Sequence, residues 1–156
     1  MKTSLKRATL LFLVQDNQIL LAMKKRGFGA GKWNGVGGKP EGSESILQTA
    51  IRECVEEINV TPIKLQQVAT LNFYFPDDKF DWNQQVSVYL CSKWNGEPTE
   101  TDEMKPKWYN LNNIPYESMW SDDAYWLPEV LKGNSVEAEF LFDDDNGVVT
   151  YQICLV

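Results

Sequence analysis

Residues 43–58 narrow the folds open to this chain more than any other segment. Apolar side chains recur there at spacings of three and four, the period of an α-helix with one buried face. They are Leu47, Ala50, Ile51, Cys54, Val55 and Ile58. We expect a helix with Ser43 as its N-cap, Glu44 in its first turn and Asn59 in a left-handed conformation after its last turn.

Strand patterns surround this helix. Residues 7–14 and 18–23 are apolar or alternating on either side of a turn, and residues 63–75 and 85–94 have similar patterns. A glycine-rich loop fills 26–42, a short helix is expected after residue 114, and the tail alternates on both sides of Asn146-Gly147, a strong hairpin signal. The length suits one α/β domain with a mixed sheet over residues 1–156.

The chain contains no histidine, which excludes Ser-His-Asp and Cys-His catalysis and His-bound zinc. Cys54, Cys91 and Cys154 are odd in number and lack CxxC spacing, so we expect buried thiols in a reducing cytoplasm. No apolar run approaches the roughly 20 residues of a membrane span, and a net charge of −7 disfavours binding to nucleic acid polymers. An enzyme of this composition must use carboxylates, lysines or a hard cation held by oxygen ligands.

Three glutamates share the far side of the predicted helix. Glu53, Glu56 and Glu57 fall within about 100° of arc, and Arg52 lies four residues before Glu56. Folding gains nothing from carboxylates that repel one another, whereas Mg²⁺ prefers oxygen ligands and removes the repulsion. A solvated acidic surface is the alternative, although such a face usually mixes lysine with glutamate. The segment therefore predicts a Mg²⁺ site.

Residues 38–60 resemble the Nudix box, G-x5-E-x7-R-E-U-x-E-E-x-G-U, in which U is a bulky aliphatic residue. The positions that fit are Gly38, Glu44, Arg52, Glu53, Glu56, Glu57 and Val60. Cys54 replaces the first aliphatic residue and Asn59 replaces the last glycine, departures that bear on the end of the helix more than on catalysis. The resemblance to the Nudix family implies an α/β/α sandwich with a mixed β-sheet and one catalytic helix.

The resemblance extends to residues 24–39, 101–108 and 119–126, which are similar to the branch of that family that hydrolyses oxidised purine nucleoside triphosphates such as 8-oxo-dGTP and 2-hydroxy-dATP. It implies Mg²⁺, or Mn²⁺ as a substitute, held by Gly37, Gly38, Glu53, Glu56, Glu57 and Glu103. It implies a catalytic set of Arg52, Glu53, Glu56, Glu57 and Glu103. It also implies a nucleotide site formed by Thr9, Lys24, Phe28, Asn34, Val36, Lys39, Phe75, Trp120, Asp122 and Asp123.

The chemistry of these side chains suits a purine. Phe28 and Trp120 can sandwich a base, worth roughly 1–3 kcal/mol per stacked base, and Asn34 offers both a donor and an acceptor. Asp122 and Asp123 are adjacent among aromatic residues, where desolvation and mutual repulsion should raise one pKa and leave a shared proton. The alternatives are that the aromatic residues belong to the core and that Asp122 caps a helix.

We expect water to attack a phosphorus of the pyrophosphate chain and to give a nucleoside monophosphate and pyrophosphate. Glu53, Glu57 and Glu103 remain alternative acceptors for the proton. The substrate would be a free nucleoside triphosphate, and the protein a cytoplasmic monomer without a nucleic acid or membrane partner. Two other functions stay open: a Nudix hydrolase of ADP-ribose, a dinucleotide or an unmodified nucleotide, and a non-catalytic nucleotide-binding module, which the intact glutamate set disfavours.

Overall fold

The computed structural model describes residues 5–156. Its strands are β1 (Lys6–Gln15), β2 (Gln18–Lys24), β3 (Trp33–Asn34), β4 (Thr61–Tyr74), β5 (Gln84–Asn95), β6 (Met104–Asn110), β7 (Val136–Phe142) and β8 (Val148–Leu155). Its helices are α1 (Ile46–Ile58) and α2 (Asp123–Leu131), and two short 3-10 helices are η1 (Asp77–Trp82) and η2 (Tyr116–Ser118). The strands form one sheet in the order β3-β2-β1-β5-β4-β7-β8, with β6 paired to β2. The expected mixed sheet is confirmed, since β1 runs parallel to β5 and β4 parallel to β7 while the other pairs are antiparallel.

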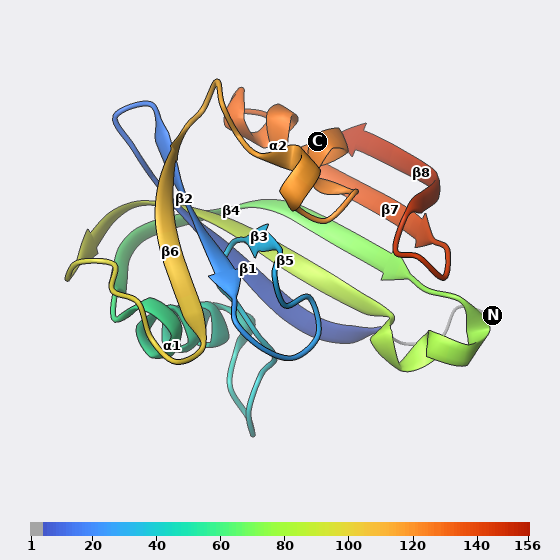
Figure 1. Ribbon diagram of the computed structural model, residues 1–156, viewed down its shortest axis with the longest axis horizontal. Helices are drawn as coiled ribbons and strands as arrows, with labels where there is room; N and C mark the ends of the chain where they lie inside the picture. The colour runs from blue at the N-terminus through green and yellow to red at the C-terminus, as the bar shows by residue number, and fades with distance from the viewer. Residues whose placement is uncertain (1–4) are drawn as a thin grey trace.

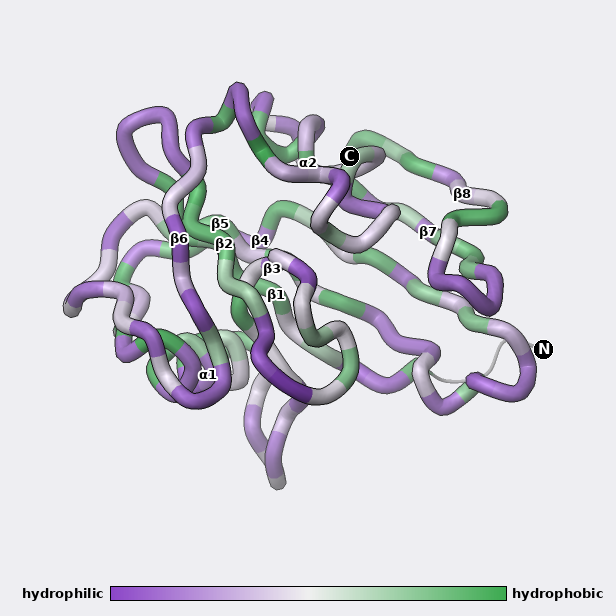
Figure 2. Tube along the Cα trace, in the orientation of Figure 1, coloured by the Kyte–Doolittle hydropathy of each residue, from purple (hydrophilic) through white to green (hydrophobic). Residues whose placement is uncertain are grey.

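The two helices cover opposite faces of this sheet (Figure 1). Successive side chains of a strand point to opposite faces, so Phe12 of β1 packs with Trp126 of α2 in one core cluster. Leu11 and Leu13 of the same strand pack with Cys54 of α1 in the other cluster. Figure 2 shows hydrophobic residues along the strands and hydrophilic ones along the connecting loops. The predicted α/β/α sandwich is confirmed.

Helix α1 begins two residues later than its sequence predicts. Ser45, not Ser43, is the N-cap: its hydroxyl accepts the amide of Gln48 (3.1 Å), and the Gln48 side chain accepts the amide of Ser45 (2.8 Å) in a capping box. Glu44 therefore precedes the helix instead of lying in its first turn. The left-handed Asn59 is confirmed, with φ of 60°.

The buried face of α1 is also rotated from the predicted one. Leu47 and Val55 are 44% and 39% exposed, whereas Thr49 and Glu57 are buried. Both polar side chains have hydrogen-bond partners in the interior, which is the condition under which polar groups are buried at little cost. A count of apolar residues cannot register such partners, and this rotation brings Glu57 against the sheet.

The structure agrees with only some of the other predictions for strands and cysteines. Strand β6 was not predicted; it contains Pro106, and proline is tolerated in an edge strand. The hairpin at Asn146-Gly147 is confirmed by β7 and β8. Cys54 and Cys91 are buried free thiols, but the free thiol of Cys154 is exposed. None of the helices within residues 5–156 has the length and apolarity that crossing a membrane requires.

Candidate active site

The backbone at Gly37 and Gly38 lies between β3 and α1 and is hydrogen-bonded to β1. The amide of Thr9 donates to the Gly38 carbonyl (2.8 Å), and the amide of Gly38 donates to Thr9 Oγ1 (3.2 Å). The amide of Gly37 donates to Glu57 Oε1 (2.8 Å). A Cβ at Gly37 would overlap the Thr9 carbonyl, and one at Gly38 would lie 2.5 Å from Glu53 Cδ, so the approach requires glycine. The Gly38 carbonyl is therefore already hydrogen-bonded to β1.

Arg52 binds the acidic residues around the start and middle of α1. Its guanidinium donates to Glu44 (2.8 Å), Glu53 (2.7 Å) and Glu56 (3.1 Å), and to the Lys39 carbonyl (3.0 Å). The expected pairing of Arg52 with Glu56 is confirmed. The Arg52 side chain does not line the cavity described below, so its contacts position the glutamates.

Glu57 is the most buried of the three helix glutamates. Burial raises its pKa to about 8, the charge of Glu53 adds to this, and the Gly37 amide and the charge of Lys24 oppose it. Burial also raises the pKa of Glu53. Glu103 is turned to Arg26, whose guanidinium donates to it at 2.9 Å.

The four expected carboxylate ligands are not gathered around one point. Across residues 5–156, no three acidic or cysteine side chains stand in a geometry that holds a metal ion. The donors nevertheless fit a hard divalent cation: they are all oxygen atoms, and Glu53 and Glu57 are neighbouring carboxylates with pKa values raised by burial. A divalent cation beside them would favour their ionised forms.

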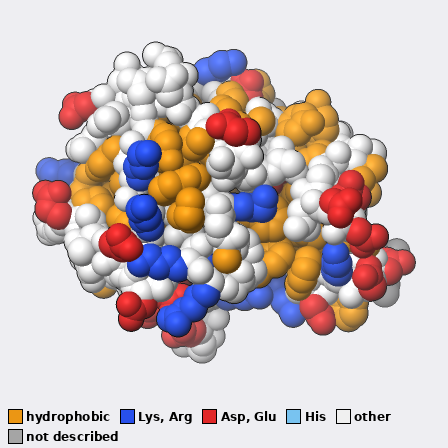
Figure 3. All heavy atoms as spheres, viewed as in Figure 1, with side chains coloured by type: hydrophobic (Ala, Val, Ile, Leu, Met, Phe, Trp, Pro, Cys, Tyr) orange, Lys and Arg blue, Asp and Glu red, His pale blue; other side chains and the backbone are white. Residues whose placement is uncertain are grey.

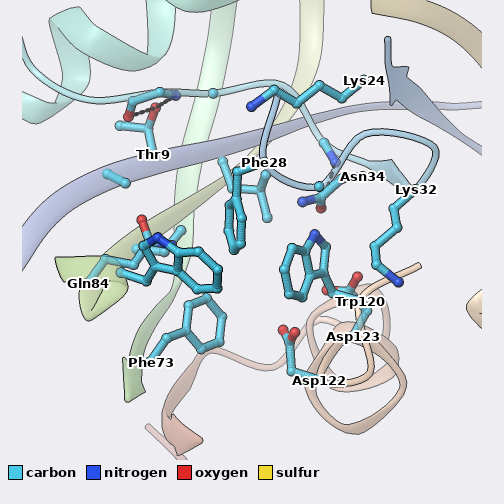
Figure 4. Close-up of a pocket in the computed structure, with 18 of the residues that line it drawn as sticks. Thr9, Lys24, Phe28, Lys32, Asn34, Phe73, Gln84, Trp120, Asp122 and Asp123 are labelled. Atoms are coloured by element: carbon cyan, nitrogen blue, oxygen red, sulfur yellow. Dashed lines mark hydrogen bonds between the residues drawn. The ribbon is translucent and has the colours of Figure 1, made fainter. Parts of the chain in front are cut away.

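A cavity of about 400 Å³ opens beside the Gly37-Gly38 segment and reaches α2. Nine of the ten residues predicted to bind the nucleotide line it: Thr9, Lys24, Phe28, Asn34, Lys39, Phe75, Trp120, Asp122 and Asp123. Figure 4 shows Thr9 and Lys24 at one end and Asp122 and Asp123 at the other. Glu57 is the helix glutamate that lines the cavity. Val36 is placed elsewhere, in the core cluster that packs against α1, where its backbone pairs with Leu11.

The predicted aromatic sandwich is closed. The rings of Phe28 and Trp120 face the cavity (Figure 4), with centroids 5.0 Å apart and planes tilted by 45°. A base between them needs about 7 Å, the sum of two carbon contacts of roughly 3.5 Å. The two rings therefore contact each other, and one of them must move before a base can lie between them.

Asp122 and Asp123 are buried at the far end of the cavity. The indole N–H of Trp126 donates to Asp122 Oδ2 (2.8 Å), whereas Asp123 Oδ2 has no hydrogen-bond partner among the described residues. Burial raises the pKa of Asp122 to about 6, and burial together with the charge of Asp122 raises the pKa of Asp123 well above its usual range. One raised pKa was predicted, whereas the pKa values of both carboxyls are raised, because both are buried. The helix-cap alternative is wrong, because the Asp122 side chain makes no capping hydrogen bond to α2.

The raised pKa values make stability depend on pH. Between the ordinary pKa of 3.8 and the pKa of about 6 in the folded protein, the folded state binds more protons at Asp122 than the unfolded state does. The free energy of unfolding should therefore fall as pH rises through this window, by on the order of 3 kcal/mol for a shift of about two units. In urea titrations from pH 4 to 8, the double variant Asp122→Asn, Asp123→Asn should lose this part of the decline. Equal pH dependence in both proteins would contradict the assignment.

Five lining residues with polar or aromatic side chains were not predicted: Lys32, Phe73, Trp82, Gln84 and Phe142. The ammonium of Lys32 lies 5.5 Å from the centroid of the Trp120 ring, within range of a cation–π contact. Lys32 follows a glycine run and Trp82 lies in a polar segment. Either setting could have marked the residue as a candidate site residue. Phe73 and Phe142 look like ordinary strand residues, and nothing in the sequence marks them as site residues.

Comparison with known proteins shows the family. The model of the NUDIX domain matches residues 4–130. The chain belongs to the Nudix hydrolase family. Two relatives of this Nudix hydrolase bear the same name, oxidized purine nucleoside triphosphate hydrolase. The one from Danio rerio is 38% identical over 148 residues, or 95% of this chain and 94% of the relative. The one from Mus musculus is 37% identical over 145 residues, or 93% and 92%.

The similarity in fold extends over most of the chain. A crystal structure of the MutT protein from Bacillus halodurans is similar with a TM-score of 0.84 and 26% identity, covering 96% of this chain and 97% of that one. Nudix hydrolases use divalent metal ions, in agreement with the oxygen donors around Glu57. The NUDIX match ends at residue 130, yet Phe142 of β7 lines the cavity. The cavity of this Nudix hydrolase is therefore lined in part by a residue beyond the matched region.

Proposed function

We propose that this Nudix hydrolase cleaves oxidised purine nucleoside triphosphates, such as 8-oxo-dGTP and 2-hydroxy-dATP, to the monophosphate and pyrophosphate, and so removes damaged nucleotides from the free pool. The observation that most supports this proposal is the buried Asp122–Asp123 pair at the end of the cavity opposite Lys24 and Glu57. The relatives named oxidized purine nucleoside triphosphate hydrolase support the same substrate class.

The aspartate pair suits an altered purine edge. Unmodified guanine presents N7 as an acceptor, whereas oxidation at C8 places a proton on N7 and makes it a donor. A buried carboxyl pair that shares a proton offers one donor and one acceptor side by side. Because Asp123 Oδ2 has no partner in the described part of the chain, a base donor there satisfies an oxygen that is otherwise costly to bury. Movement of the shared proton allows more than one oxidised base.

We propose Mg²⁺, with Mn²⁺ as a substitute, as the cation of the opposite end. Its ligands would come from Glu53, Glu56, Glu57 and Glu103 and from the backbone of Gly37 and Gly38. When bound, such an ion lowers the pKa of a water molecule and neutralises charge on the bridging oxygen. Arg52 holds Glu53 and Glu56 in place, and the Gly37 amide holds the Glu57 carboxylate.

The remaining steps belong to side chains along the cavity. The Lys24 ammonium neutralises the phosphate chain, since it lines the cavity and its charge acts on Glu57. Glu53, Glu57 or Glu103 accepts the proton of the attacking water. The residues of one chain supply both ends of the cavity, so we propose a monomer acting as one domain over residues 1–156. We place it in the cytoplasm, acting on free nucleotides without a nucleic acid or membrane partner.

The test of this function is a hydrolysis screen with Mg²⁺ over 8-oxo-dGTP, 2-hydroxy-dATP, the four normal deoxynucleoside triphosphates, ADP-ribose and a dinucleoside polyphosphate, ranked by kcat/KM. Oxidised purines should rank first, with pyrophosphate as a product. A higher rank for ADP-ribose or the dinucleotide would replace the proposed substrate. Binding without turnover of any compound would make the protein a nucleotide-binding module.

Removal of metal ions should abolish turnover. EDTA should reduce hydrolysis of 8-oxo-dGTP to the background rate, and Mg²⁺ or Mn²⁺ should restore it, because carboxylate and carbonyl oxygens suit these hard cations. Zinc should restore little activity, since the chain contains no histidine. The measurement is the initial rate after dialysis and addition of each ion. Tightly held zinc that is required for turnover would contradict the assignment.

A further inference from the structure

Trp82 ends η1, the short helix between β4 and β5, and lines the same cavity. Its ring centroid lies 4.4 Å from that of Phe28 and 5.6 Å from that of Phe75. Phe28 contacts Trp120 as well, at 5.0 Å, so Phe28 is in contact with both indoles. A base that enters the cavity between the two indoles must therefore displace Phe28 or one of the indoles.

Trp82 is held from two directions. The Asn83 side chain accepts the amide of Phe75 (2.6 Å) and closes the segment that carries η1. The Lys79 ammonium lies 5.3 Å from the centroid of the Trp82 ring and donates to the Asp144 carbonyl (3.1 Å) in the β7–β8 turn. Figure 3 shows acidic side chains gathered at the end of the molecule where Figure 1 places η1 and this turn, which favours a lysine there.

Phe28 is held less firmly. Its exposure, 41%, is close to the 37% of Trp82, but it stands between two glycines with positive φ, Gly27 and Gly29, both at 84°. Glycine leaves the backbone on both sides free to adopt other conformations. A ligand that enters the cavity can therefore displace Phe28 at lower cost than Trp82.

We propose that Trp82 stacks on the base of the substrate, which takes the place that Phe28 occupies against the Trp82 and Trp120 rings. This inference rests on the proposed function for the class of substrate and adds a residue that recognises it. The two fused rings of a purine cover more of an indole face than the single ring of a pyrimidine does. Trp82 therefore favours purines over pyrimidines, whereas the aspartate pair distinguishes oxidised purines from normal ones.

The test compares Trp82→Ala with Phe80→Ala, a matched control on η1 whose ring is 62% exposed and does not line the cavity. Trp82→Ala should raise KM for 8-oxo-dGTP and dGTP roughly 5- to 15-fold, the lower part of what one stacked base contributes. The value of kcat should stay within about twofold, because loss of equal binding to ground and transition states appears in KM. The KM for dCTP should change less, Phe80→Ala should match the wild type, and Trp82→Phe should recover most of the loss.

A binding measurement makes the test independent of hydrolysis. Calorimetric titration of the metal-free protein with 8-oxo-dGMP and dCMP should show the same purine-specific loss of affinity in Trp82→Ala. Unchanged KM and Kd in this variant, or equal losses on purines and pyrimidines, would overturn the role of Trp82 while leaving the proposed function intact. A wild-type protein that binds 8-oxo-dGMP through Trp82 but hydrolyses no triphosphate would support the stacking role and overturn the proposed function.

Discussion

Glu57→Gln should reduce kcat for 8-oxo-dGTP at least ~100-fold, and Glu56→Gln should do the same, judging from the several kcal/mol that a bound metal ion contributes to such reactions. Glutamine preserves the size of the side chain and removes its charge. The amide oxygen of Gln at position 57 can still accept the Gly37 amide, so the backbone beside Thr9 should keep its position. Activity is measured at saturating Mg²⁺ and again over a range of Mg²⁺ concentrations.

Stability should follow the opposite trend. In EDTA, thermal unfolding of Glu57→Gln should occur at the wild-type temperature or slightly higher, since the variant removes a buried carboxyl whose ionised form is disfavoured by burial and by Glu53. Glu97→Gln, at an exposed position outside the cavity, serves as the matched control and should retain full activity. Normal hydrolysis by both glutamate variants would show that the metal ligands lie elsewhere.

Asp122→Asn should reduce discrimination between 8-oxo-dGTP and dGTP by roughly 1–3 kcal/mol, or about 5- to 150-fold, the cost of leaving a buried polar group unpaired. The amide fixes a neutral group where a shared proton could move. Its oxygen can still accept the indole N–H of Trp126, so the packing of α2 should survive. The measurement is the ratio of kcat/KM for the two nucleotides in the variant and the wild type.

A poor, non-selective substrate provides the control for this variant, because its hydrolysis depends on the glutamates and should change little. Asp123→Asn should act similarly, and the double variant should depart from additivity because the two carboxyls are coupled. Equal losses on every nucleotide would give Asp122 a structural role. The protein would then remain a Nudix hydrolase with another substrate.

The sequence was most informative where contacts are local. Arg52 and Glu56 are four residues apart on one helix, and their ion pair follows from helix geometry alone. The left-handed Asn59 and the β7–β8 hairpin also depend on neighbouring residues. The burial of Glu57 could not be predicted in this way, because its partner Gly37 lies 20 residues earlier in the chain.

The cavity was predicted through family resemblance more than through pattern. That resemblance supplied Asn34 and the aspartate pair, but it placed Val36 in the nucleotide site, where the structure has a core residue. It could not supply Trp82, whose position depends on Lys79 reaching Asp144, 65 residues away. Tertiary contacts of this length leave no trace in periodicity or spacing.

The β7–β8 hairpin contributes to the base end of the cavity although it lies beyond the NUDIX match. Phe142 stacks on Phe75 at 4.9 Å, and the carbonyl of Asn146 accepts the hydroxyl of Ser121, next to Trp120 (2.8 Å). The glutamates stand on α1, on the opposite face of the sheet from α2. Substitutions in the tail can therefore alter which base is accepted while the hydrolytic residues stay unchanged. Substrate range and chemistry can thus change separately, and residues 142–147 join Trp82 and the aspartate pair as positions at which a new nucleotide specificity can be sought.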